Sequence, residues 1–205
     1  MAGVARTGRS GLSLLPDARV RAALLDNELQ AQLDRTLLDA PIGVFIRLRT
    51  YLLKQAQETQ TWNDVYRQLR LASDQGGLVL INLGPSVDQG SSPDHFHFDS
   101  GARLSFGITL REARSGSSLV AYRFHFHLPA ERLPEFLRFD LNPQVHDNPL
   151  GEPRCHLHPG LEPVRLPLPA LDPFEVLDRV FFVIEPALQP GSGPESTIHN
   201  PHSTI

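Results

Sequence analysis

Apolar and polar residues alternate through much of the second half of the chain. Between residues 95 and 158, four segments place apolar side chains on one parity and polar side chains on the other. A period of two is typical of strands that bury one face of an antiparallel sheet. The residues that we expect on the buried face are Phe96, Phe98, Leu104, Phe106, Phe124, Phe126, Leu137 and Phe139.

The first half has a helical period instead. Apolar residues recur at spacings of three to five in residues 17–38, and a second helical stretch follows at residues 42–58. We expect a third helix from Thr61 to about Gly76, and then a buried strand at residues 78–83. Further along, Asp172 and the proline after it predict the N-cap and first turn of a last helix.

These elements predict an α+β fold, with N-terminal helices packed on one face of an antiparallel β-meander and a C-terminal helix. Turns are expected at residues 115–118 and 129–134, and a short strand at residues 164–168. The expected organisation is a flexible N-terminus at 1–16, a helical N-terminal segment at 17–75, the sheet with its C-terminal helix at 76–185, and a disordered tail at 186–205.

Histidines gather on the polar parity of the predicted strands. Three His-x-His pairs occur, and in a strand each pair places both imidazoles on one face, about 7 Å apart. An ordinary solvated sheet face more often carries Thr, Lys and Glu, so this composition favours a functional face. The charged and histidine residues of this face are His95, His97, Asp99, Arg103, Arg123, His125, His127, Arg138, Asp140, Arg154, His156 and His158.

Composition narrows the classes of function. The net charge of -4 and the pI near 6.1 argue against a protein that coats nucleic acid by bulk charge, although a local basic site is compatible with them. The single cysteine, Cys155, excludes an intramolecular disulfide, and its apolar parity predicts a buried structural thiol. No apolar run is long enough for a secretory signal or a membrane span, so we expect no membrane association and a cytoplasmic location.

A resemblance adds to this picture. Arg138-Phe139-Asp140, then Pro143, a loop with His146, His156-Leu157-His158-Pro159-Gly160 and a helix opening at Pro173 follow one another. This order resembles the C-terminal pattern of TumE-like toxins of bacterial toxin-antitoxin systems and of related uncharacterised small bacterial domains, over roughly residues 95–185. The resemblance implies Arg138, Asp140, His156 and His158 as functional positions and an antitoxin as protein partner. This chain lacks a lysine near its last His-x-His and adds a helical N-terminal half.

One chemistry that suits this face is metal-independent cleavage of RNA. Because imidazole titrates near neutrality, one histidine can take the proton of the 2'-hydroxyl while another protonates the leaving oxygen. Arginines would hold the phosphate and stabilise the added charge. The candidate catalytic residues are His125, His127, Arg138, Asp140, His156 and His158, and the candidate substrate-binding residues are His97, Arg103, Arg123 and Arg154.

Two alternatives stay open, and neither fixes a cofactor. In the first, histidines and a carboxylate bind Zn, Mn or Fe, although neighbouring arginines would lower the affinity for a cation. In the second, the protein is a non-catalytic module that binds or regulates a protein partner through its N-terminal helices. The candidate metal ligands are His125, His127, Asp140, His156 and His158, with Asp99 as another carboxylate.

The turn at residues 129–134 also predicts which residues face each other. Antiparallel partners in a hairpin have a constant sum of residue numbers, and keeping the apolar residues together requires that this sum be odd. A sum of 265 fits the middle of the turn and places His125 opposite Asp140 and His127 opposite Arg138. We therefore expect Asp140 to contact one of these histidines, and His156 and His158 to share their pocket.

Overall fold

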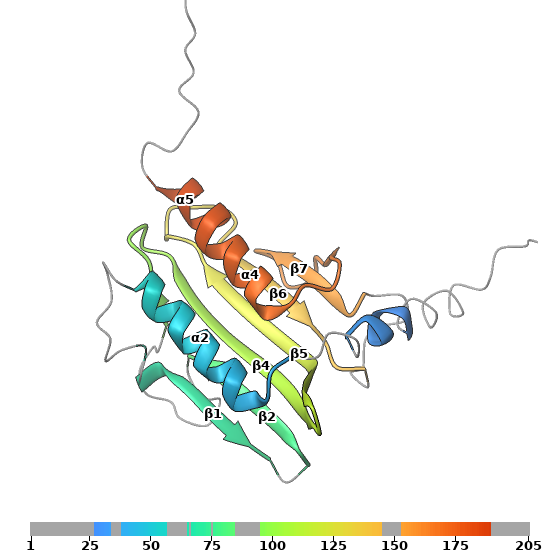
Figure 1. Ribbon diagram of the computed structural model, residues 1–205. Helices are drawn as coiled ribbons and strands as arrows, with labels where there is room; N and C mark the ends of the chain where they lie inside the picture. The colour runs from blue at the N-terminus through green and yellow to red at the C-terminus, as the bar shows by residue number, and fades with distance from the viewer. Residues whose placement is uncertain are drawn as a thin grey trace, which may run out of the picture.

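An eight-stranded antiparallel sheet organises the computed structural model, which describes residues 27–33, 38–56, 65, 67–74, 76–84, 95–144 and 153–189. The strands follow the order β1-β2-β4-β5-β6-β7-β8, and β3 pairs with β4 (Figure 1). The α+β class that we expected is confirmed. The elements are α2 (Pro41–Gln55), β1 (Leu69–Ser73), β2 (Leu78–Leu83), β3 (Phe96–His97), β4 (Arg103–Ala113), β5 (Gly116–His127), β6 (Phe136–Leu141), β7 (Cys155–Pro159), β8 (Leu166–Pro167), α4 (Pro173–Arg179), the π-helix η1 (Val180–Ile184) and α5 (Glu185–Leu188).

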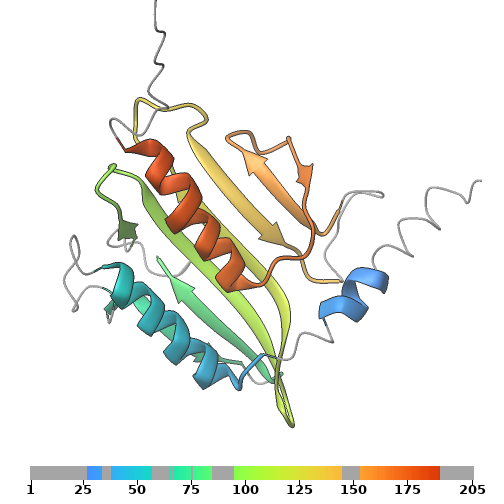
Figure 2. The same cartoon turned by 45° about the horizontal axis from the view of Figure 1, so that its top comes forward.

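Two helical rods cover one face of the sheet, and the opposite face, which these rods leave uncovered, is called the open face. Helix α2 and the continuous α4-η1-α5 helix lie side by side and run along the strands (Figure 2). In α2, Val44, Leu48 and Leu52 are fully buried, because residues four apart lie on one face of a helix. This arrangement buries the apolar parity of the strands and turns the histidine-bearing parity away from the helices.

The aromatic residues of the strands form the core, as the alternation predicts. Six of the eight residues that we expected on the buried face are buried, while Phe98 and Leu137 are partly buried against the same core. The Phe96 ring lies 5.2 Å from the ring of Phe181, which belongs to the C-terminal helix. Edge and tilted contacts of this kind add to the free energy of apolar burial.

The C-terminal helix begins as predicted but continues further. Asp172 Oδ1 accepts hydrogen bonds from the backbone N–H groups of Phe174 and Glu175, at 2.7 and 3.0 Å, and the Glu175 side chain accepts from the Asp172 N–H. The expected disordered tail from residue 186 is wrong for the first residues, because the helix reaches Leu188. Pro186 is the second residue of α5, so the point where a proline removes one helical N–H donor directly follows the π-helical stretch.

The expected third helix is wrong over its second half. Residues 65, 67 and 68 are helical, but Leu69–Ser73 is strand β1, which pairs with β2. The Asp74 side chain accepts hydrogen bonds from the N–H groups of Gly76 and Leu78, at 2.8 and 2.9 Å, and so closes a hairpin turn where we expected a helix end. Pairing with β2 therefore overrides the helical propensity of this segment.

The turn between β4 and β5 also comes earlier than expected. It occupies Arg114 and Ser115, and Gly116 already belongs to β5. Ser117 exchanges backbone hydrogen bonds with Leu38, so the chain before α2 adds a bridge to the edge of this hairpin. Gly116 has φ +145°, and a Cβ there would lie 2.3 Å from the Leu38 carbonyl oxygen, which explains the glycine.

Several expectations concern residues outside the described ranges. These are the N-terminus at 1–16, most of the helical stripe at 17–38, the loop at 86–94, His146 within 145–152, and the tail from residue 190. Within the ranges that are described, no helix is both long and apolar enough to cross a membrane.

Candidate functional site

The strand register aligns the polar side chains of the open face in rows that cross the sheet. In each row, directly opposed residues on neighbouring strands are Cα partners, so their side chains emerge side by side. The Asp140 row runs from β1 to β7 through Arg70, Asn82, Gly107, Arg123, Asp140 and His156. The Arg138 row holds Ser105, His125, Arg138 and His158, and the His127 row holds His97, Arg103, His127 and Phe136.

These rows correct the predicted pairing of β5 with β6. Asp140 lies opposite Arg123, and Arg138 lies opposite His125, so the residue numbers sum to 263 and not to 265. The prediction that Asp140 contacts His125 or His127 is therefore wrong. Both sums are odd and keep the apolar residues on one face, so the hydrophobic pattern cannot separate them, and the turn decides.

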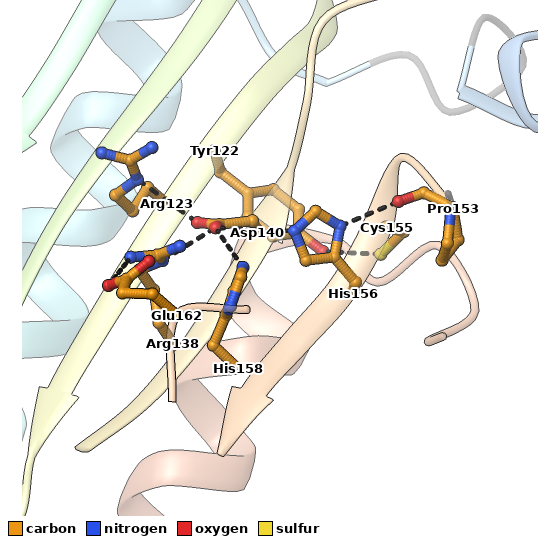
Figure 3. A network of polar contacts seen from close by, with 9 residues as sticks. All are labelled: Tyr122, Arg123, Arg138, Asp140, Pro153, Cys155, His156, His158 and Glu162. Atoms are coloured by element: carbon orange, nitrogen blue, oxygen red, sulfur yellow. Dashed lines mark hydrogen bonds and ion pairs between the residues drawn. The ribbon is translucent and has the colours of Figure 1, made fainter. Parts of the chain in front are cut away.

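Asp140 is the centre of the site, and its histidine partners come from β7 (Figure 3). The Nε atom of Arg138 donates to Oδ2 at 2.8 Å, and Nε of Arg123 donates to Oδ1 at 3.4 Å. The Nε2 atoms of His158 and His156 lie 3.4 and 3.7 Å from Oδ2. Asp140, His156 and His158 are only 3 %, 1 % and 1 % exposed, so Asp140 of β6 and the two histidines of β7 converge as expected in a cluster closed to bulk solvent, but His125 and His127 do not join it.

The hydrogen bond of His156 fixes which ring nitrogen carries a proton. Its Nδ1 lies 2.8 Å from the carbonyl oxygen of Pro153, and because a carbonyl can only accept, Nδ1 must donate. Burial lowers the pKa of His156, so the ring is neutral near neutral pH. The lone pair of Nε2 therefore points at the carboxylate of Asp140, and two electron donors face each other.

These three side chains could together hold a metal ion. Asp140, His156 and His158 each offer one ligand atom, and the three atoms lie within 4.8 Å of one another. Two ligands bound tetrahedrally at about 2.1 Å from a metal are about 3.4 Å apart, close to the 3.4 and 3.7 Å found here. Histidines that bind metals commonly donate their other ring nitrogen to a carbonyl, as His156 does, and ligating carboxylates commonly accept a hydrogen bond, as Asp140 does from Arg138.

His158 adds a second sign that a partner fits here. Both of its ring nitrogens are buried, and among the described residues neither has a hydrogen-bond partner that meets ordinary geometry. A buried polar atom without a partner costs roughly 1–3 kcal/mol of folding free energy, so natural structures seldom retain one without a use.

A second carboxylate, which the alternation of polar and apolar residues does not predict, balances the positive charge of the arginines around Asp140. Glu162, in the loop after β7, accepts a hydrogen bond from Nη1 of Arg138. Desolvation alone would lower the pKa of Arg138, but the bonds to Glu162 and Asp140 outweigh it and raise the pKa. The bond from Arg138 lowers the pKa of Glu162, so two cations and two carboxylates meet here. Strand alternation carries no signal for a loop residue.

The other histidines of the open face form a separate group. The rings of His125 and His127 stack 4.0 Å apart, and His127 meets His95 edge-on at 5.9 Å. Burial, followed by the neighbouring His127 and Arg138, lowers the pKa of His125 to about 4. Burial also lowers the pKa of His127, followed by Arg103 and His95. His125 and His127 are thus neutral near pH 7, and neither belongs to the group with metal-ligand spacing.

The candidate substrate-binding residues divide into three that are exposed on the open face and one that is buried. Arg123, Arg103 and His97 are exposed on the open face. Arg154 is buried: its Nε donates to the Asn142 carbonyl at 2.9 Å, and its Nη1 donates to Gln30 Oε1 at 3.1 Å. Arg154 therefore connects residues 27–33 to the end of β6, and its expected role in substrate binding has no geometric support.

Cys155 is the buried structural thiol that its apolar parity predicts. Its Sγ donates to the Pro169 carbonyl at 3.1 Å and lies 3.4 Å from the hydroxyl of Tyr122. Burial raises the pKa of the thiol, which disfavours the reactive thiolate. Cys155 faces the helices, away from Asp140, and so takes no part in the open-face site.

A hollow of about 720 Å³ adjoins Asp140 on the open face. Its lining includes Asp140, Arg123 and His125 at one wall and Arg70 and Asn82 across from them. The buried site therefore has one side that borders an accessible cavity. Searches of protein-family models, curated proteins and solved structures found nothing similar to this chain, so the functional reading depends on the geometry of Asp140, His156 and His158 and of the hollow beside them.

Proposed function

We propose that this protein is a metal-dependent hydrolase that binds a divalent transition-metal ion through Asp140, His156 and His158. The observation that carries the proposal is the lone pair of His156 Nε2, which faces the carboxylate of Asp140 at 3.7 Å. A cation between them turns a repulsive arrangement into a favourable one. Two histidines and one carboxylate are ligands that suit Zn²⁺ or Fe²⁺.

The neighbouring side chains support hydrolysis rather than a purely structural metal. Three protein ligands leave a coordination position for water, whose pKa a bound metal lowers. Arg138 and Arg123 both donate to Asp140, and Arg123 has a side chain that is 65 % exposed beside the hollow. A guanidinium in that position can hold an anionic group of a substrate and stabilise negative charge that develops during attack by water.

The pairing of Arg138 with Glu162 reduces the repulsion that the neighbouring arginines would exert on a metal ion. Arg138 has Glu162 as a second carboxylate partner, so Asp140 is not its only counter-charge. The carboxylate of Asp140 can therefore accept from Arg138 and still offer an electron pair to a metal. We expect moderate rather than extreme metal affinity, because the ligand set carries a single negative charge.

Metal titration tests the proposal directly. Purified full-length protein is stripped with chelator and titrated with Zn²⁺ by calorimetry and with Co²⁺ by visible absorption, which reports coordination geometry. We expect one ion per chain and a tetrahedral Co²⁺ spectrum. His158→Ala should abolish both signals, while His97→Ala, an exposed histidine of another row, should leave them unchanged. One-to-one binding that survives His158→Ala, or no binding at all, would contradict the proposal.

The metal-free ribonuclease suggested by the TumE-like resemblance remains a second candidate. The stacked, half-buried pair of His125 and His127 beside Arg103 favours it, because these rings lie nearer the surface than His156 and His158. The lowered pKa of His125, about 4, weakens it as a general base at neutral pH. RNA cleavage that persists in chelator and is lost in His127→Ala would favour this candidate over the metal hydrolase.

A further inference from the structure

We infer that the hollow above Gly107 binds a phosphate-bearing small molecule of nucleotide size, with its phosphate at Arg123. The inference deepens the proposed function, since this molecule would be the substrate of the metal site. The hollow, at about 720 Å³, falls within the roughly 300–1,000 Å³ that small-molecule sites occupy. It crosses the strands from β1 to β6 along the Asp140 row.

Small side chains create the hollow. Gly107, Ser105, Thr109 and Ala121 lie side by side on β4 and β5, where large side chains would fill the space. A Cβ at Gly107 would have Leu80 Cδ1 as its nearest neighbour, at 3.8 Å, so the fold itself does not require a glycine there. The absent side chain is therefore better explained by what the hollow receives.

The two walls of the hollow carry cations. Arg70 on β1 and Arg123 on β5 belong to the same row, three strand spacings or about 14 Å apart. Among the lining residues that the structure describes, Asp140 is the one carboxylate, and it pairs with Arg123 and with Arg138. The described part of the lining thus offers two arginines and one carboxylate, which favours an anionic ligand.

The floor suits the uncharged part of such a molecule. Leu80 is 42 % exposed and lies between Ala72 of β1 and Thr109 of β4 as their Cα partner. It offers an apolar surface to the flat face of a base. Asn82, in the Asp140 row, offers both a donor and an acceptor for the edge of that base. Of the two arginines that line the hollow, Arg123 is the one beside Asp140, so the phosphate would lie at the metal end of the hollow and the nucleoside towards β2.

Calorimetry with adenosine monophosphate, adenosine and inorganic phosphate tests the inference on both zinc-loaded and chelator-treated full-length protein. We expect adenosine monophosphate to bind, and adenosine to bind at least tenfold more weakly. Gly107→Leu should fill the hollow and lower affinity for adenosine monophosphate at least tenfold, with Gly107→Ala as the graded control. Arg70→Ala should weaken binding several-fold, whereas Arg114→Ala, in the β4-β5 turn, should not.

The outcomes separate the hollow from the metal. Zinc binding that is unchanged in Gly107→Leu, together with lost nucleotide binding, supports the inference and shows that the variant folds. Equal binding of adenosine and adenosine monophosphate, or full affinity in both Gly107→Leu and Arg70→Ala, would overturn it while leaving the metal proposal intact. Nucleotide binding that depends on Gly107 in a protein that takes up no zinc would support the hollow and refute the metal hydrolase.

Discussion

Replacement of Asp140 by asparagine tests the centre of the site most sharply. The change keeps the size of the side chain but removes the negative charge that Arg138 and Arg123 share. Arg138, whose side chain is 12 % exposed, then has Glu162 as its remaining carboxylate partner, and that partner is 63 % exposed. Asp140→Asn should fold, since no volume is lost from the core.

The magnitude follows from the burial of the pair. Removing one partner of a buried ion pair costs about 3–5 kcal/mol, and the amide oxygen of asparagine can still accept from Arg138, so we expect a loss of about 2–3 kcal/mol in the free energy of unfolding. Added metal should produce a second difference in the free energy of unfolding between the wild type and Asp140→Asn. Zinc at a hundred times its dissociation constant stabilises a folded protein by about 2.7 kcal/mol, and Asp140→Asn should lose this increment.

Urea unfolding followed by circular dichroism, with chelator and with zinc, measures both differences. Glu162→Gln serves as the matched control, because it also removes a negatively charged partner of Arg138, but an exposed one. It should lower the free energy of unfolding by at most about 1 kcal/mol and leave the stabilisation by zinc unchanged. If Asp140→Asn without metal stayed within about 1 kcal/mol of the wild type, the buried pair would not be stabilising the fold. If zinc stabilised both proteins equally, Asp140 would not be a metal ligand.

Three further predictions concern the fold. Phe124→Ala, at a fully buried ring, should lower the free energy of unfolding by about 3–5 kcal/mol in the same urea assay, and a loss below about 1 kcal/mol would contradict the core assignment. The pKa of His125 is about 4 when folded against 6.5 unfolded, so the unfolded chain binds more protons as pH falls from 6.5 to 4. Stability should therefore fall across that window, by up to about 3 kcal/mol and less where solvent reaches the ring, and His125→Gln should flatten this slope. Gly116→Ala should lower the melting temperature more than Gly77→Ala, because both have positive φ but only the first would meet the Leu38 carbonyl; equal losses would refute the close approach.

The parts of the fold that the sequence predicts are those with a local signal. Burial of Phe124 and Phe126 follows from alternation within one strand, and the capping box at Asp172 follows from neighbouring residues. Strand β1 could not be predicted in this way, because its five residues take their conformation from pairing with β2 and from the turn at Asp74. Tertiary pairing here outweighs a weak local preference.

In the site, too, the residues placed by strand parity could be predicted from the sequence, and those placed by turns and loops could not. Parity alone places Asp140, His156 and His158 on a common face, and the meander brings β6 beside β7. Which residues of β5 face Asp140 depends on the turn, and parity does not encode it. Glu162 lies in a loop, and the burial of Arg154 depends on contacts with residues 27–33, so neither role can be read from strand periodicity.

The rows that cross the sheet make the site sensitive to evolutionary changes in the lengths of the turns. A two-residue slip in any hairpin keeps every apolar side chain inside, because the side-chain period is two, yet it moves one strand's contribution out of the Asp140 row. Natural selection for a buried apolar face alone would not detect such a slip. The lengths of the turns therefore carry functional information that the strands do not, and a variant with an altered turn could be fully folded and inert. Among candidate relatives of this chain, equal spacing between the strand residues of the row would be a better guide to shared chemistry than similarity of the core.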